Sequence, residues 1–175
     1  MKKLRLLFSM LCVCALSLTM SSQTTLIAFV ADSDGPVTNI RSAPNGKIVA
    51  KLPTSKVYRI WVKNARNGWW QVSTVEEGEN ARTVNLTGAR TYWVHSSVLM
   101  LNSNNYNGER YNIRKTPSSS GKVVYSFTHE CSWRPLDIKG SWVKVRDVQG
   151  QYTGWIESSH LCDNPYGPCD GTGGY

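Results

Sequence analysis

The chain has 175 residues, 41% of them hydrophobic, and a formal net charge of +8 at pH 7. This length leaves room for one ordinary domain or two small ones. Without the first 22 residues, 17 Lys and Arg face 12 Asp and Glu, and the remaining charge of +5 does not argue for nucleic-acid binding; it suits anionic polymers or an acidic protein partner.

Residues 1–22 have the pattern of a secretory signal peptide. The basic start KKLR is followed by the apolar run LLFSMLCVCALSL and then by small polar residues. The run is too short for a transmembrane helix, and no later segment approaches the ~20 apolar residues that one needs. We expect cleavage after Ser22 and a secreted or periplasmic protein. A lipid anchor on Cys12 or Cys14 stays open, although neither follows the small residue that lipoprotein signals require.

Short apolar or alternating runs separated by turn residues predict strands along the rest of the chain. In the first part these are residues 26–30, 38–41, 48–52, 57–62, 69–73, 82–86 and 91–94. In the second part they are residues 99–102, 111–114, 123–127, 134–138, 142–146 and 153–156. No window has a convincing helical apolar stripe, and only HSSVL and ESSHL are candidates for single helical turns. The sequence predicts an all-β protein.

Four sequence blocks occur twice in the same order, which indicates an internal repeat. NIR before a proline-containing turn appears twice, GKIVAKL returns as GKVVYSF, GWWQV as GSWVKV, and YWVHSSVL as GWIESSHL. Two copies of five or six short strands predict two tandem small β-barrels, because closure removes exposed edge strands. The expected domains are residues 23–100 and 101–162, followed by a Cys- and Gly-rich tail at 163–175.

The copies differ most between Trp70 and Trp93, where the first copy is longer. We interpret its additional residues as an extended hairpin, with RTVNL at 82–86 as the returning strand, because Val84 and Leu86 alternate with polar residues. A disordered loop is the alternative.

These blocks resemble the bacterial SH3 (SH3b) family of cell-envelope modules. In the first copy the resemblance rests on NIRSAP, GWWQV and WVHSSVL, and in the second on NIR with Pro117, WVKV and GWIESSHL. Tyr92 stands where the family pattern has Gly. The resemblance implies a binding module rather than a catalyst, since such modules commonly direct peptidoglycan hydrolases to cell-wall peptides.

The sequence carries no recognisable catalytic motif. A papain-like site needs a Cys at the start of a helix, and neither Cys131 nor Cys162 lies in a helical pattern. H-E-x-x-H and a nucleophile elbow are both missing. We therefore predict that the protein is not an enzyme and has no cofactor.

Three cysteines follow residue 22, and in an exported protein they tend to oxidise. The compact turn DNPYGP favours a disulfide between Cys162 and Cys169, while pairing of Cys131 with one of them stays open. H-x-C also occurs at 129–131 and 160–162, and residues i and i+2 of a strand point the same way, so a zinc ion is a further alternative. We predict the disulfide and no metal.

Seven Trp and eight Tyr are more than a core of this size needs, which indicates an aromatic binding surface. The tryptophans that recur in the blocks are expected in the core: Trp69, Trp93, Trp142 and Trp155. Aromatic residues beside or between those positions are expected to face outward, because strand neighbours face opposite ways. The predicted ligand-binding residues are Trp61, Trp70, Tyr92, Tyr106, Trp133 and Tyr152. Barrel packing or contact between the copies is the alternative for each.

The repeated NIR motif is expected to be structural, with Arg41 and Arg114 bonding to the backbone of the following loop. The sequence thus predicts a non-catalytic exported module that recognises a cell-envelope peptide, with peptidoglycan as the first candidate. Two linked modules raise avidity if both engage one polymer. The alternative is a protein–protein interaction or scaffold subunit of an envelope or secreted assembly.

Overall fold

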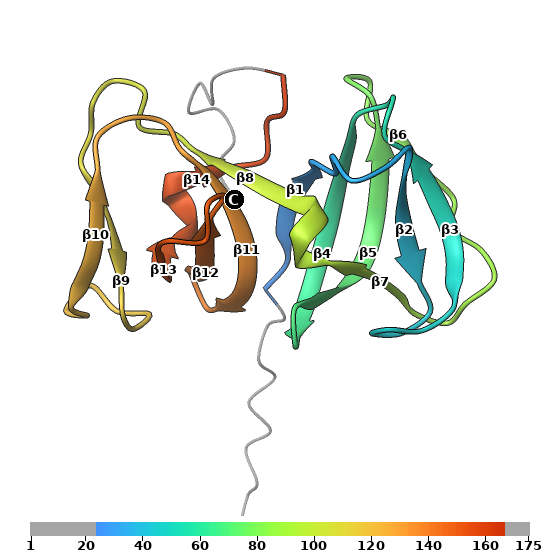
Figure 1. Ribbon diagram of the computed structural model, residues 1–175, viewed down its shortest axis with the longest axis horizontal. Coiled ribbons are helices and arrows are strands. Elements are labelled where there is room, and N and C mark those ends of the chain that lie inside the picture. Colours follow the sequence, from blue (N-terminus) through green and yellow to red (C-terminus); the bar gives the residue numbers. More distant parts are fainter. Residues whose placement is uncertain (1–23, 167–175) are drawn as a thin grey trace, which may run out of the picture.

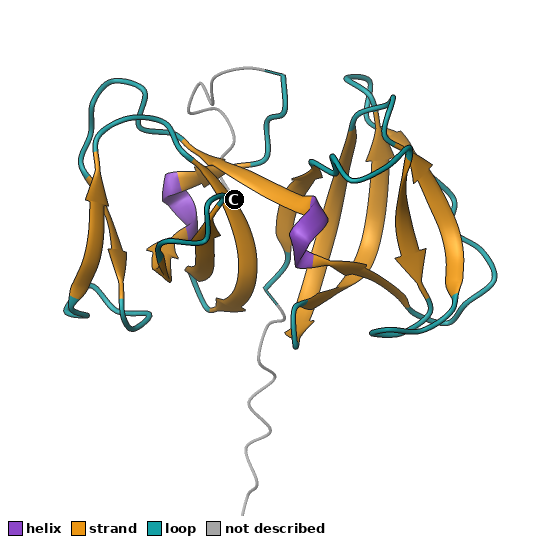
Figure 2. Ribbon diagram, in the orientation of Figure 1, coloured by secondary structure: helices purple, strands orange, loops and turns teal. Residues whose placement is uncertain are grey.

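The computed structural model describes residues 24–166, which form an all-β protein (Figure 1). Its 14 strands pair antiparallel throughout and join into one continuous sheet. The helical elements in this part of the chain are two 3-10 turns, Ser96–Val98 and Ser158–His160, which Figure 2 shows beside the strands. Both turns lie in the two segments predicted to form them, and the all-β prediction is confirmed.

The strands fall into two halves on either side of a shared strand, β8 (Leu99–Ser103). The first half contains β1 (Leu26–Val30), β2 (Val37–Arg41), β3 (Ile48–Pro53), β4 (Tyr58–Arg66), β5 (Trp69–Glu77), β6 (Arg82–Thr83) and β7 (Tyr92–His95). The second contains β9 (Tyr111–Arg114), β10 (Val123–Phe127), β11 (Ser132–Lys139), β12 (Trp142–Asp147), β13 (Thr153–Glu157) and β14 (Leu161–Cys162). Each strand predicted from the sequence is present; β1, β9 and β10 have the predicted bounds, the others have shifted ends, and β14 is additional.

The strand β8 ties the two halves together, as its path between them in Figure 1 shows. Leu99 and Met100 pair with β1, whereas Leu101 and Asn102 pair with β11. Leu99 and Leu101 are fully buried, and one hydrophobic cluster extends through both halves. The domain boundary expected between residues 100 and 101 therefore falls inside a strand that both halves share.

The two arginines of the NIR motif hold equivalent loops. Arg41 Nη1 donates to the carbonyl of Gly46 at 2.8 Å, and Arg114 Nη1 donates to the carbonyl of Gly121 at 2.9 Å. A Cβ at either glycine would lie within 3.0 Å of a backbone atom of its loop, so both loops require glycine. The predicted structural role of the two arginines is confirmed.

The extended hairpin of the first half is shorter than predicted. The returning strand β6 has two residues instead of the expected five at 82–86. One more backbone bond follows, from Val84 N to Val75 O at 2.8 Å, and the chain then leaves the sheet. Val84 and Leu86 are partly buried against the core, so their packing, rather than further strand pairing, sets the path of this segment.

The recurring tryptophans lie on the outer face of the sheet, which corrects the prediction that they form the core. The partly exposed residues are Trp69, Trp93, Trp142 and Trp155. The inward positions belong to the next residue in each strand: Trp70, Val94, Val143 and Ile156. The alternation was predicted correctly but its phase was wrong by one residue, because a strand's pattern alone does not say which face meets the core.

Trp69, one of the outer tryptophans, is covered by neighbouring side chains. The guanidinium carbon of Arg41 lies 5.8 Å from the ring centroid of Trp69, and the ring of His95 meets Trp69 edge-on at 5.0 Å. These contacts explain why a partly exposed indole recurs here without forming the core. Within residues 24–166, the structure has no helix with the length and apolar character needed to cross a membrane.

Candidate functional site

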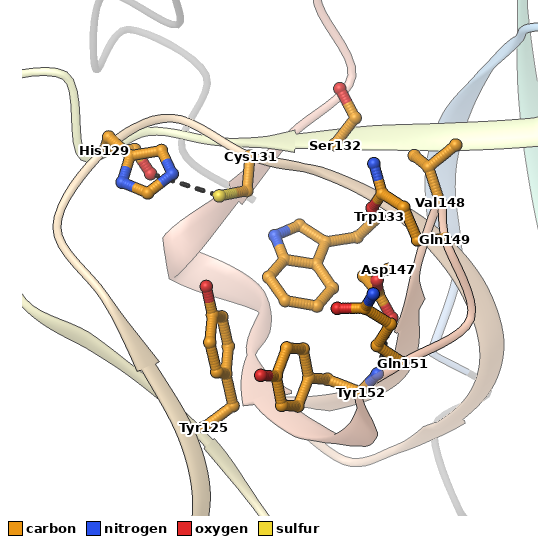
Figure 3. Close-up of a pocket in the computed structure, with 10 residues that line it drawn as sticks. All are labelled: Tyr125, His129, Cys131, Ser132, Trp133, Asp147, Val148, Gln149, Gln151 and Tyr152. Atoms are coloured by element: carbon orange, nitrogen blue, oxygen red, sulfur yellow. Dashed lines mark hydrogen bonds between the residues drawn. The ribbon is translucent and has the colours of Figure 1, made fainter.

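A cavity of about 390 Å³ opens at one end of the second half (Figure 3). Its lining comes from β10, the β10–β11 loop, the start of β11 and the turn between β12 and β13. The residues that define its chemistry are Tyr125, Cys131, Trp133, Asp147, Gln151 and Tyr152. A volume of this size is in the range of small-molecule and peptide side-chain sites.

Trp133 supplies an unused hydrogen-bond donor to this cavity. The residue is 1% exposed, and its Nε1 is buried with no hydrogen-bond partner among the described residues. In Figure 3 the indole nitrogen lies on the side of the cavity that carries His129 and Cys131. A buried donor without a partner costs about 1–3 kcal/mol. An acceptor oxygen from a ligand removes that cost.

Two stacked tyrosines form the adjacent wall. The rings of Tyr125 and Tyr152 have centroids 3.9 Å apart and planes 17° apart. Tyr125 also lies 6.4 Å from Trp133, and Phe127 packs against Trp133 at 5.2 Å. Tyr152 is 37% exposed, so the stack presents aromatic surface at the mouth of the cavity. Such a wall suits the apolar part of a peptide or a sugar ring.

The β12–β13 turn is closed by Asp147. Its Oδ1 accepts from the backbone N–H of Tyr152 at 2.6 Å, its own N–H donates to the Tyr152 carbonyl at 3.1 Å, and its carbonyl accepts from Gly150 N at 3.0 Å. Gly150 has a φ of +76°, a conformation that favours glycine at this point of the turn. These bonds fix Tyr152 where it stacks on Tyr125.

The opposite rim is held by a buried polar network from the shared strand. The N–H of Cys131 donates to Ser103 Oγ at 2.9 Å, and the N–H of Ser103 donates to the Cys131 carbonyl at 2.9 Å. Ser103 Oγ in turn donates to Asn105 Oδ1 at 2.8 Å, and both of these residues are fully buried. The cavity is therefore preformed on both rims.

The electrostatic environment keeps the cavity's ionisable donors protonated. Burial raises the pKa of Cys131, and the carboxylates of Glu130 and Asp147 raise it further. Burial also raises the pKa of Tyr125, with smaller contributions from Cys131, Tyr152 and Asp147. At neutral pH the thiol and the phenol are therefore neutral groups that can donate hydrogen bonds.

Two of the six predicted ligand-binding residues, Trp133 and Tyr152, line this cavity together. Trp133 was expected to be exposed and is instead buried, so that part of the prediction is wrong. Trp70 was also expected to face outward, but it is fully buried, and its Nε1 donates to the carbonyl of Pro135 at 3.0 Å. Trp70 thus forms a contact between the two halves, which was the alternative interpretation.

The other three predicted residues do not line the cavity. Trp61 is partly buried, with the Arg59 guanidinium 5.8 Å from its ring centroid. Tyr92 is partly buried and its hydroxyl accepts from Ala89 N at 3.4 Å. Tyr106 is 40% exposed.

Of the three cysteines that follow residue 22, the structure describes Cys131 and Cys162. Cys131 is a free thiol, so its pairing with another cysteine is not observed. Cys169 lies outside the described residues, and its disulfide with Cys162 stays a prediction. Within residues 24–166, no three His, Cys, Asp or Glu side chains gather closely enough to hold a metal ion. His160, one of the proposed zinc ligands, stacks on Tyr111 with centroids 4.0 Å apart.

Tyr125 and Asp147 were not predicted as site residues, although the repeat contains a signal for the first. When GKIVAKL and GKVVYSF are aligned, Tyr125 replaces Ala50 and Phe127 replaces Leu52. Aromatic residues that appear in only one copy mark a local difference in packing. Nothing in the sequence singles out Asp147.

No family model and no curated protein matches this chain. Among solved structures, NlpC1 from Trichomonas vaginalis is similar with a TM-score of 0.32 and 17% identity over 81% of this chain and 47% of that one. NlpC2 from Trichomonas vaginalis gives 0.31 and 16%, over 81% of this chain and 49% of its own. The chain thus spans about half the length of these structures, and likenesses this distant transfer no property to it.

Proposed function

We propose that this protein is an exported tandem pair of bacterial SH3-like barrels that binds a cell-envelope peptide, with peptidoglycan as the first candidate. The family resemblance is supported by the four repeated blocks and by the equivalent loops that Arg41 and Arg114 hold. The observation that carries the binding proposal is the unpartnered indole N–H of Trp133 beside an aromatic cavity.

In this proposal a peptide carbonyl accepts a hydrogen bond from Trp133 Nε1. The stacked faces of Tyr125 and Tyr152 hold an apolar part of the same ligand, and the protonated Tyr125 hydroxyl adds a second donor. The side-chain oxygens of Gln151 and Asp147 accept hydrogen bonds from N–H groups of the ligand. Recognition then depends on a preformed wall and a small number of polar contacts.

The chemistry of Cys131 supports binding rather than catalysis. A catalytic thiol needs a lowered pKa, usually from a neighbouring imidazole, but the pKa of Cys131 is raised by burial. Its Sγ contacts the backbone carbonyl of His129 at 3.4 Å, so the hydrogen bond involves the main chain and not the His129 ring. The proposal therefore assigns the thiol no nucleophilic role.

The test is co-sedimentation of the secreted form, residues 23–175, with purified peptidoglycan. Trp133→Phe keeps most of the buried aromatic surface but removes the indole donor, and it should weaken binding about tenfold. Tyr106→Ala is the control, because Tyr106 is similarly exposed to Tyr152 but does not line the cavity, and it should bind like the wild type. A wild-type protein that stays in the supernatant contradicts the proposal.

A second arm separates peptide from glycan. An amidase that removes the stem peptides leaves the glycan strands intact, and binding should be lost after this treatment. Retained binding would show that the ligand is a sugar and would overturn the peptide assignment. Circular dichroism of each variant reports whether its fold is intact.

A further inference from the structure

A groove of about 520 Å³ lies between the two halves of the protein. It is bounded by the start of the chain's first half, by the β3–β4 loop, by β8 and by β11. Much of its wall is apolar, including Phe29, Val57 and Met100. The groove shares only the lining residue Val148 with the aromatic cavity, so the groove and the cavity are separate sites.

Arg134 provides a cationic group in this groove that has no partner. Its Nη1 is buried without a hydrogen bond, and none of the ion pairs within residues 24–166 includes it. Lys56, which also lines the groove, is already engaged, with its Nζ 2.9 Å from Glu77 Oε1. A buried guanidinium N–H without an acceptor is costly. An anionic acceptor at this guanidinium would remove that cost.

The described residues around Arg134 do not supply an anionic acceptor. Directly opposite it on β12 stands another cation, Arg146, and like charges at such positions are unfavourable. Asp32 lines the groove, but its carboxylate accepts from Thr38 Oγ1 at 2.8 Å and from the Asp34 N–H at 3.2 Å, and it forms no ion pair with Arg134. A bound anion would therefore offset both the unpaired donor and the like-charge pair.

We infer that this groove binds the free C-terminal carboxylate of a peptide whose last residue is apolar. The guanidinium of Arg134 is suited to a carboxylate, which it can bind through two parallel hydrogen bonds. The apolar wall beside it takes the terminal side chain. Thr54 Oγ1 donates to the Gly35 carbonyl at 2.9 Å and keeps acceptor capacity for a peptide N–H, which favours a peptide over a fatty acid.

The test is calorimetric titration of the secreted form with N-acetyl-alanyl-leucine and with its C-terminal amide. The free acid should bind about tenfold more tightly than the amide. Arg134→Gln should abolish this preference. Arg146→Gln, which removes the same charge from an exposed residue on the facing strand, should reduce this preference only in part. Equal affinity for acid and amide, or a preference that survives Arg134→Gln, would overturn the inference.

Additional variants and a second ligand separate the remaining outcomes. If Arg134→Gln does not fold, Val57→Asp places a repelling carboxylate in the groove wall and should also abolish binding of the acid. Octanoate should bind more weakly than the peptide acid, and equal binding would assign the groove to a lipid carboxylate instead. Trp133→Phe should leave this binding unchanged, so failure of the groove and failure of the proposed peptidoglycan site are distinguishable.

Discussion

Trp70 and Trp133 are equally buried tryptophans in the two halves of the molecule, with 0% and 1% exposure. They differ in their polar ends. The indole N–H of Trp70 donates to the carbonyl of Pro135 across the two halves, whereas that of Trp133 has no partner among the described residues and belongs to a cavity wall. Because the two side chains are equally buried, the partner of the indole N–H is what distinguishes them.

The halves also differ in two corresponding strands of the repeat, β3 and β10. The first half has Ala50 and Leu52 where the second has Tyr125 and Phe127. In the second half both rings contact Trp133, and Tyr125 also lines the cavity. Corresponding strands of the repeat therefore carry aliphatic side chains at these two positions in one half and aromatic side chains beside the cavity in the other.

The largest effect expected from this comparison is on stability. Trp70→Ala should lower the free energy of unfolding by about 3–5 kcal/mol, because it leaves a large buried cavity. It also leaves the carbonyl of Pro135 without its donor. Urea unfolding measures the change. A loss below about 1 kcal/mol would contradict the structural role of Trp70.

A smaller effect on binding should follow from the tyrosine stack. Tyr152→Ala removes the outer ring that stacks on Tyr125 and should weaken ligand binding by about 0.5–1.5 kcal/mol, with little change in stability. Tyr106→Ala is a matched control, since the two tyrosines are 40% and 37% exposed. Equal losses of affinity for both variants would show that exposure, and not the stack, determines binding.

The smallest effect concerns Cys131. Its pKa is raised in the folded protein, first by burial and then by Glu130 and Asp147. Its contribution to stability is therefore complete below the pKa of the unfolded-state thiol and is lost as the pH rises through the folded pKa. The free energy of unfolding should fall in that alkaline window, and Cys131→Ser should show less of this fall. Alkylation of Cys131 should be slower than that of a peptide thiol at the same pH.

The sequence predicted the strands well because each short apolar run is bounded by turn residues. It also identified the loop-holding role of Arg41 and Arg114, which depends on local geometry. It failed on the phase of the alternation at Trp69 and Trp70, since which face is inner depends on packing across the whole sheet. The sharing of β8 between the halves is a long-range property that no local pattern indicates.

For the site, sequence reasoning found Trp133 and Tyr152 because both are aromatic residues beside the repeated blocks. Their roles differ from the expected ones: Trp133 is buried, and Tyr152 is held by hydrogen bonds to Asp147. Tyr125 lies inside the repeated block GKVVYSF, and that pattern indicates a strand rather than a ligand site. The unpaired state of an indole N–H depends on three-dimensional contacts and cannot be inferred from sequence.

The central claim is that the indole N–H of Trp133 is the donor that a ligand uses. It is tested most directly by two-dimensional ¹H–¹⁵N spectra of residues 23–175 during titration with soluble muropeptides. Indole signals are assigned with Trp133→Phe and Trp70→Phe. The account predicts that the Trp133 Nε1–H signal moves downfield with ligand while that of Trp70 stays in place. A Trp133 signal that does not move when muropeptides bind would contradict it.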